Sequence, residues 1–446
     1  MLATAVEGGH GRLDLRSIDA GAAGIGSSTL LTQRSLVACL DLAFEGGPTV
    51  SVGTAFFPRQ QELNSKFSWG EWAGYHSAAV YADFHDIEYN AIREAAALID
   101  TSPLYKYVVS GKDAMTLLDR VMTRDISTLQ RDRVIYSPWC DEAGKLVDDG
   151  TVARIGEDSY RITAADPCYR WFLLNATNLD VEVSDISDQT AALALQGQLS
   201  REVLEAASGQ DWKDLKYFGR RMTQIAGVDV DVTRTGYTGD RGYELWMPTD
   251  GALAVWDKIF EVGRDYGIYP VGIRAMDVAR VEAGLILIEA EYTSARHAVS
   301  PEQQYSPFEL GLDKLVQFDK ASDFVGKRAL LAEQKAGGPA RRLVGLDIDW
   351  SGIEGMFAKH GLAPGVSPMV TRDAIPVYKQ NKQVGRCTSY TWGPTIKKMV
   401  GFGSLDKALE PLGTRVSVEW TVEGERGKVG ATVVAMPFLD LQRKRT

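Results

Sequence analysis

The pattern of apolar and polar positions predicts a β-hairpin in the middle of the chain. Residues 228–235 (VDVDVTRT) alternate apolar and polar side chains with the two-residue period of a half-buried strand, and residues 242–248 (GYELWMP) resume that alternation. The intervening segment GYTGDRG contains three glycines. Because glycine adopts positive φ without strain, we expect a loop here that approaches a ligand closely.

Other segments predict helices and further strands. Apolar side chains recur at roughly helical spacing in several stretches, which is typical of amphipathic helices. Short apolar runs separated by glycine turns predict antiparallel strands in the first half of the chain. The predicted helices are 88–100, 112–122, 252–267 and 274–284, and the strands predicted before the hairpin lie in 105–111, 134–165 and 193–197.

The two ends of the chain differ from its middle. Residues 1–50 are rich in Gly, Ala, Ser and Thr and predict a flexible N-terminal extension. Residues 333–342 are charged and contain Gly and Pro, which indicates a linker. Beyond this linker, short strands with turn signals predict a small barrel or sandwich.

Composition narrows the class of protein. The 446 residues suffice for two to four domains, and 49 Lys+Arg against 59 Asp+Glu give a net charge of −10. This charge argues against a nucleic-acid partner but does not exclude a small basic opening that binds an anionic cofactor. No apolar run of membrane-spanning length and no secretory signal occur, and the four Cys and five His lack metal-binding spacing. We therefore expect a cytoplasmic protein with reduced thiols, no membrane partner and no metal.

The hairpin segment carries a resemblance to a known family. Residues 234–245 (RTGYTGDRGYEL) match the pattern Arg-Thr-Gly-Tyr-Thr-Gly-acidic-x-Gly-aromatic-Glu of the glycine cleavage T-protein superfamily. The chain resembles this family from about residue 88 to 438. Further matching segments follow in the family's order at 135–149, 195–204, 306–316, 323–330 and 384–395.

The resemblance implies an α+β fold of three domains in a ring around a channel that holds tetrahydrofolate. Two mixed α/β folate-binding domains would interleave within residues 51–335, the second at about 104–189. A small C-terminal β-barrel would occupy residues 336–446.

By the same resemblance, Asp149 is the catalytic candidate. It matches the second Asp of the family's Gly-x-x-x-Asp-Asp segment, which places a carboxylate near N5 of the folate. A fixed carboxylate there can stabilise a developing positive charge or handle a proton. The alternative is that Asp148 and Asp149 merely end a turn after Gly144.

The resemblance also implies a set of cofactor-binding residues. Glu244 can accept hydrogen bonds from the pterin amino and amide groups, and Tyr237 offers a ring face and a hydroxyl. Tyr136 would line the same channel, and Thr163 stands where the family usually has Asn. For each of these the alternative is an ordinary strand or core position. The candidate cofactor-binding residues are Tyr136, Thr163, Tyr237, Glu244 and Trp392.

Three positions depart from the family pattern. Met276 stands in place of an arginine, residues 100–105 read DTSPLY in place of Asp-Val-Ser-His-Met-Gly, and Pro437-Phe438 lacks the arginine that follows in the family. An aromatic run at 67–84 is able to cage a methylated cation or stack on an aromatic ring, although ordinary core packing explains it equally well. The candidate substrate-pocket residues are Trp69, Tyr75, Tyr105, Trp139 and Met276.

These departures favour a tetrahydrofolate-dependent methyltransferase or demethylase that moves a methyl group from a small N-, S- or O-methylated substrate to N5. The alternative is a true aminomethyltransferase of the glycine cleavage system. A non-catalytic folate-binding protein fits less well. The expected partner is a small-molecule methyl donor, with a separate carrier or dehydrogenase protein left open and the oligomeric state undetermined.

Overall fold

The computed structural model describes residues 51–446, which form one compact unit. The prediction of a flexible extension at 1–50 lies outside the described residues. Within 51–446, none of the helices has both the length and the apolar character needed to cross a bilayer.

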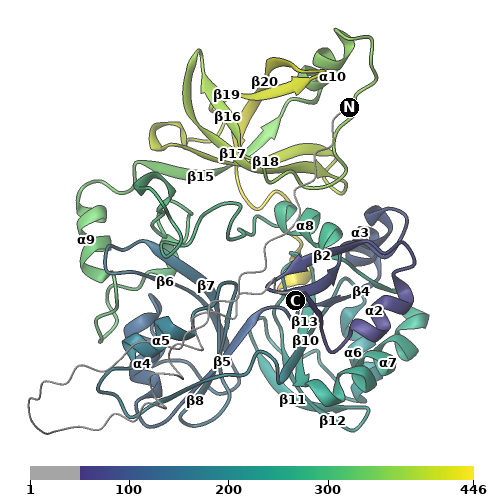
Figure 1. The fold of residues 1–446 in the computed structure, drawn as a ribbon, viewed down its shortest axis with the longest axis vertical. Helices are drawn as coiled ribbons and strands as arrows, with labels where there is room; N and C mark the ends of the chain where they lie inside the picture. Colours follow the sequence, from purple (N-terminus) through teal and green to yellow (C-terminus); the bar gives the residue numbers. More distant parts are fainter. Residues whose placement is uncertain (1–50) are drawn as a thin grey trace, which may run out of the picture. The chain divides into compact units, whose positions relative to one another are not determined.

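A six-stranded sheet lies between two layers of helices (Figure 1). Alternate strand residues such as Leu193 and Val232 pack on α6 (Ser200–Ser208) and α7 (Ala252–Gly263). Residues of opposite parity, such as Ala194, face α3 (His85–Glu94) and α8 (Ile273–Glu282). The strand order is β11 (Arg220–Ile225), β12 (Val228–Thr233), β13 (Gly242–Pro248), β10 (Thr190–Gln196), β4 (Ala96–Asp100) and β14 (Ile268–Pro270).

The strands β12 and β13 confirm the predicted hairpin, with Thr233 opposite Glu244. The prediction of one helix over 88–100 is wrong in its second half. The helix α3 ends at Glu94, and residues Ala96–Asp100 form the strand β4. This short run is buried on both faces between β10 and β14, and burial on both faces removes the alternation by which a strand is recognised.

The second sheet has five antiparallel strands and one buried face. Its core side packs on α4 (Ala114–Val121) and α5 (Tyr169–Asn175). The strand order is β6 (Val134–Cys140), β7 (Leu146–Arg154), β8 (Ser159–Ala164), β5 (Tyr105–Ser110) and β9 (Glu182–Asp185).

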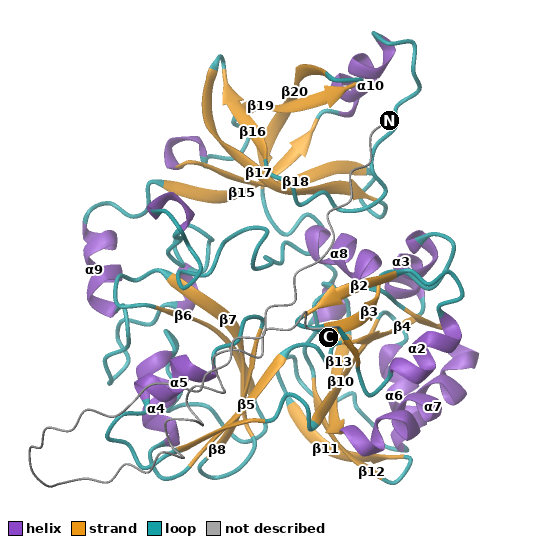
Figure 2. Cartoon of the chain, viewed as in Figure 1, coloured by secondary structure: helices purple, strands orange, loops and turns teal. Residues whose placement is uncertain are grey.

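The C-terminal part is a closed six-stranded barrel, which confirms the α+β fold with a C-terminal barrel. The helix α10 (Trp350–Ala358) was not predicted. Asp349 caps its N-terminus, because the Asp349 side chain accepts a hydrogen bond from the Ser351 amide. The helix lies beside β19 and β20 (Figure 2). The barrel order is β15 (Arg341–Ile348), β18 (Lys398–Asp406), β17 (Lys382–Gly393), β16 (Ile375–Lys379), β19 (Arg415–Val422) and β20 (Glu425–Val434).

The remaining elements are short. The aromatic run at 67–84 contains a hairpin of β2 (Trp69–Trp72) and β3 (Tyr75–Ala78), and β3 pairs in parallel with β1 (Val52–Gly53). The helix α2 (Phe57–Leu63) precedes this hairpin, and α9 (Lys327–Lys335) precedes the barrel.

Candidate functional site

Asp149 on β7 is held by two tyrosine hydroxyls. Tyr136 on β6 donates to Asp149 Oδ2 at 2.6 Å, and Tyr292, from the segment after α8, donates to Oδ1. Burial raises the pKa of the Asp149 carboxyl, while the two phenol hydrogen bonds act in the opposite direction. The result is an oriented carboxylate whose basicity is increased.

The neighbouring Asp148 has a different, structural role. Its side chain is fully buried and accepts hydrogen bonds from the backbone amides of Asp149 (2.7 Å), Ala165 (3.1 Å) and Asp166 (2.9 Å). It therefore fixes the turn that follows β8. Because successive strand residues point to opposite faces, Asp148 faces the core and Asp149 faces away from it.

Close packing of β7 on β8 positions Asp149. A Cβ atom at Gly150 would lie 1.9 Å from the Thr163 carbonyl oxygen, so only glycine fits next to Asp149. The Thr163 hydroxyl accepts a hydrogen bond from the Thr151 amide at 3.0 Å and lies 2.7 Å from the Thr151 hydroxyl. Thr163 is thus buried and engaged within its own sheet.

The hairpin presents a second carboxylate. Glu244 Oε2 accepts a hydrogen bond from the Thr235 hydroxyl at 2.5 Å. Burial raises the pKa of Glu244, and the nearby Arg161 guanidinium lowers it. Arg161, from β8 of the other sheet, donates to Asp231 at 2.6 Å and lies 4.4 Å from the Trp246 ring. Arg161 therefore ties the two sheets together beside Glu244.

Tyr237, at the tip of the same hairpin, lies close to Asp149. Its hydroxyl donates to the Ile286 carbonyl, in the segment that also supplies Tyr292. Burial raises the pKa of the Tyr237 phenol, and the Asp149 carboxylate adds to this effect. The hydroxyl is consequently engaged, and the ring face is the part of Tyr237 left to contact a ligand.

The candidate substrate-pocket residues do not form one group. Tyr75 and Tyr105 line a common cavity of about 400 Å³, which Asp185 and Asp188 also line, and the Tyr75 hydroxyl donates to Asp188. Trp69 packs instead on Phe57 and His76, on neighbouring parts of the chain.

Three other predicted residues lie in a core or pack against one. Trp139 has no exposed surface and packs against Phe172 inside the core of the second sheet. Its side chain therefore faces this core, contrary to the prediction that it lines a substrate pocket. Met276, on α8, is buried in the cluster that packs α8 against α3. Trp392 is partly buried and packs against the barrel core, with the ring of Trp350 of α10 at a separation of 5.0 Å.

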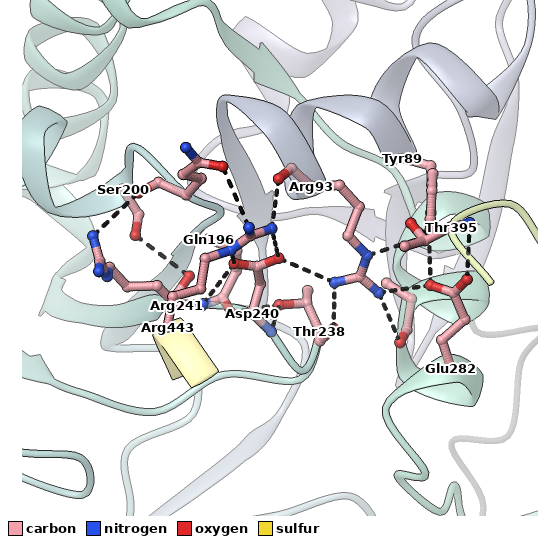
Figure 3. Close-up of polar contacts among 12 residues, drawn as sticks. Tyr89, Arg93, Gln196, Ser200, Thr238, Asp240, Arg241, Glu282, Thr395 and Arg443 are labelled. Atoms are coloured by element: carbon pink, nitrogen blue, oxygen red, sulfur yellow. Dashed lines mark hydrogen bonds and ion pairs between the residues drawn. The ribbon is translucent and has the colours of Figure 1, made fainter. Parts of the chain in front are cut away.

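The structure also brings in residues that the sequence did not single out. Besides Tyr292 and Arg161, a buried network surrounds Arg93 of α3 (Figure 3). Arg93 donates to the Thr238 carbonyl at 2.9 Å and to Glu282 of α8 at 3.0 Å. No local motif marks these residues, because their partners lie far away in the sequence.

A second buried network joins α8 to the barrel. Arg280 is fully buried and donates to Glu291 at 2.6 Å, to Asp277 at 2.7 Å and to the Ser389 hydroxyl of β17 at 2.9 Å. Glu291 also accepts a hydrogen bond from Ser389 at 2.5 Å. This ionic cluster fixes the segment from which Tyr292 reaches Asp149.

The comparisons with known proteins agree with this geometry. Residues 57–320 match the family model of the GCVT N-terminal domain, and residues 341–440 match that of the glycine cleavage T-protein C-terminal barrel domain. The chain belongs to the glycine cleavage T-protein family. The recognition of this family from the 234–245 motif is therefore confirmed.

Relatives of this T-protein family member are named aminomethyltransferases. One from Caldanaerobacter subterraneus subsp. tengcongensis is 35% identical over 74% of this chain and 82% of its own. Another from Bacillus subtilis is also 35% identical, over 79% and 90%. The crystal structure of glycine cleavage system aminomethyltransferase T from Bartonella henselae has a TM-score of 0.73 at 24% identity, covering 87% of this chain and 98% of that one, which shows the shared fold.

Proposed function

We propose that the chain transfers a one-carbon unit to N5 of tetrahydrofolate and that its first candidate activity is that of an aminomethyltransferase. The single observation that carries this proposal is the Asp149 carboxylate, held by Tyr136 and Tyr292 next to the Tyr237 ring. The names of the relatives favour this activity over the methyl transfer that the sequence departures favoured. They also argue against a non-catalytic folate-binding protein.

The donor set of the site fits a reduced folate. Glu244 Oε2 accepts a hydrogen bond from the Thr235 hydroxyl, and within residues 51–446 no side chain or amide donates to Glu244 Oε1. That oxygen suits the amino and amide N–H groups of a pterin. The Tyr237 ring adds an apolar face beside it. We propose that Glu244 and Tyr237 hold the pterin and that Tyr136 lines the same site.

The chain's residues would contribute orientation and charge to the transfer. Tetrahydrofolate, when bound, supplies the N5 lone pair that accepts the one-carbon unit. Asp149 stabilises positive charge near that atom or holds a proton at Oδ1 or Oδ2. The hydroxyls of Tyr136 and Tyr292 keep both oxygens in place. The raised pKa of Asp149 brings its basicity closer to neutral pH, where proton transfer is more effective.

The test is to identify the product. The protein is incubated with tetrahydrofolate and an aminomethylated lipoyl carrier protein, and folate products are separated by chromatography while ammonia is measured. Methylene-tetrahydrofolate and ammonia in equal amounts support the proposal. Their absence, with an active relative as the positive control, rules out aminomethyl transfer.

A second candidate is methyl transfer from a small cationic substrate. The cavity lined by Tyr75 and Tyr105 combines two aromatic rings with the carboxylates of Asp185 and Asp188. This combination attracts a methylated ammonium or sulfonium group. Formation of 5-methyl-tetrahydrofolate in a screen of methylated amines, sulfonium compounds and methoxy aromatics would support this alternative.

A further inference from the structure

Residues 442–446 pack against the glycine-rich hairpin loop. Arg443 forms a two-pronged contact with Asp240 of the loop, from Nε to Oδ1 at 2.7 Å and from Nη2 to Oδ2 at 2.9 Å (Figure 3). Its Nη2 also donates to the Arg93 carbonyl at 2.6 Å. A planar guanidinium meeting both oxygens of a carboxylate fixes direction as well as distance.

A second group of contacts holds the same segment. Arg234, at the start of the loop, donates to the Thr446 carbonyl at 2.8 Å. The Lys444 ammonium lies 5.7 Å from the centre of the Tyr217 ring. Burial raises the pKa of Tyr217 to about 12, and the Glu244 carboxylate adds to this effect. Residues 442–446 therefore reach the side of the hairpin near the proposed pterin-binding carboxylate.

The charges of the Arg93 network balance only when Arg443 is counted. The side chains of Asp240 and Glu282 are fully buried, and Arg93 contacts both. Arg93 lies 3.3 Å from Asp240 and 3.0 Å from Glu282, so one guanidinium faces two buried carboxylates. Arg443 supplies the second positive charge, and its contacts with Asp240 are the shorter ones. An unbalanced buried carboxylate is strongly unfavourable.

The loop that this network holds also carries Tyr237. Thr238, the next residue, is fully buried. Its carbonyl accepts a hydrogen bond from Arg93, and its hydroxyl donates one to the Gln196 side chain. The loop position of Tyr237 therefore depends on contacts made at Thr238 and Asp240. One of these two anchors, Asp240, depends in turn on Arg443.

We infer that the segment 442–446 is a latch for the folate-binding hairpin and that Arg443 is its positioning residue. This inference rests on the proposed function in that the hairpin is taken to bind tetrahydrofolate. Arg443 does not touch the reacting atoms in this arrangement. Its loss should therefore weaken cofactor binding and raise KM for tetrahydrofolate, with little change in kcat.

The test compares three variants of the full chain. Arg443→Ala removes both the positive charge and the two-pronged contact with Asp240. Arg443→Lys keeps the charge but loses the two-pronged contact. Arg445→Ala is the matched control, because it removes a positive charge from the same segment whose ion pair is with Asp440, outside the hairpin. Hydrogen exchange of the amides in residues 236–241 and calorimetric titration with tetrahydrofolate are measured for each.

For Arg443→Ala we expect exchange in 236–241 and the Kd for tetrahydrofolate both to rise by about tenfold. Arg443→Lys should give a smaller rise in both, and Arg445→Ala should match the parent. If the amides of residues 236–241 exchange at the same rate in Arg443→Ala as in the parent, the inference that residues 442–446 hold the hairpin is wrong. Faster exchange with unchanged Kd would overturn its role in cofactor binding. If the parent itself fails to bind tetrahydrofolate, the proposed function fails, while the exchange measurement still decides whether the latch exists. If Arg443→Ala does not fold, Arg443→Lys provides the same comparison.

Discussion

Replacing Asp149 by Asn isolates the charge of the carboxylate from its shape. The side chain stays the same size, and its remaining oxygen can still accept a hydrogen bond from Tyr136 or Tyr292. The other tyrosine hydroxyl can rotate to accept a hydrogen bond from the new NH₂ group. We therefore expect the variant to fold and to retain tetrahydrofolate binding, because Glu244 and Tyr237 are unchanged.

The size of the effect follows from the role of the charge. Removing a positioned acid–base or electrostatic group lowers kcat by about 10² to 10⁴. This corresponds to about 3 to 5 kcal/mol of lost transition-state stabilisation. Although kcat falls, the free energy of unfolding of the Asn variant should rise relative to that of the parent. The folded state raises the pKa of Asp149 above the ordinary 3.8, so it holds a proton that the unfolded chain releases, and the parent loses stability as pH rises through that window. The Asn variant avoids this loss.

Single-turnover rates, calorimetric tetrahydrofolate affinity and melting curves from pH 3.5 to 8 would measure these effects. Asp148→Asn is the control, because Asp148 accepts backbone hydrogen bonds at the turn after β8. That variant should lose about 1–3 kcal/mol of stability by leaving buried amides unpaired. Near-parental turnover in Asp149→Asn would refute the catalytic assignment. A melting temperature that does not gain on the parent as pH rises would refute the argument from burial.

Three further predictions test other parts of the site. Glu244→Gln should raise the Kd for tetrahydrofolate by about tenfold, because a charge-assisted hydrogen bond becomes a neutral one, and an unchanged calorimetric Kd would remove Glu244 from the pterin site. Arg280→Met should lower the free energy of unfolding by about 3–5 kcal/mol in urea titrations, since it leaves Glu291 buried without its cation; a loss below 1 kcal/mol would contradict this account. Gly150→Ala should disrupt the pairing of β7 and β8 because of the 1.9 Å approach to Thr163, and parental near-ultraviolet circular dichroism would show that the strands can separate at little cost.

The sequence predicts best those parts of the site that lie on one regular element. The alternation along 228–235 and 242–248 is a direct record of one buried face, and it places Tyr237 and Glu244 on a hairpin that the structure contains. The choice of Asp149 over Asp148 came from the family resemblance, and it agrees with the two-residue period of β7, which turns the two side chains to opposite faces. In each case local geometry alone decides which way a side chain points.

The sequence predicts poorly what depends on packing between distant segments. Trp139 lies in a matched segment, yet its position on β6 turns it into the core of the second sheet. Tyr292 lies in irregular chain after α8, where no periodicity marks its direction, and it reaches Asp149 across 143 positions. The partners of Arg161 and Arg443 are likewise 70 and 203 positions away. Such contacts are set by tertiary structure, which a pattern read along one segment does not contain.

The contact between Arg443 and the Arg93 carbonyl spans 350 positions of the chain. At ribosomal rates, roughly 20 to 70 s separate the synthesis of these two residues. During that interval the first sheet and its hairpin can form, but Asp240 and Glu282 share a single guanidinium. The loop at 236–241 therefore gains its second cation only after the barrel strands have been made. A nascent chain stopped between β20 and Arg443 should show faster hydrogen exchange in this loop than a chain that includes Arg443.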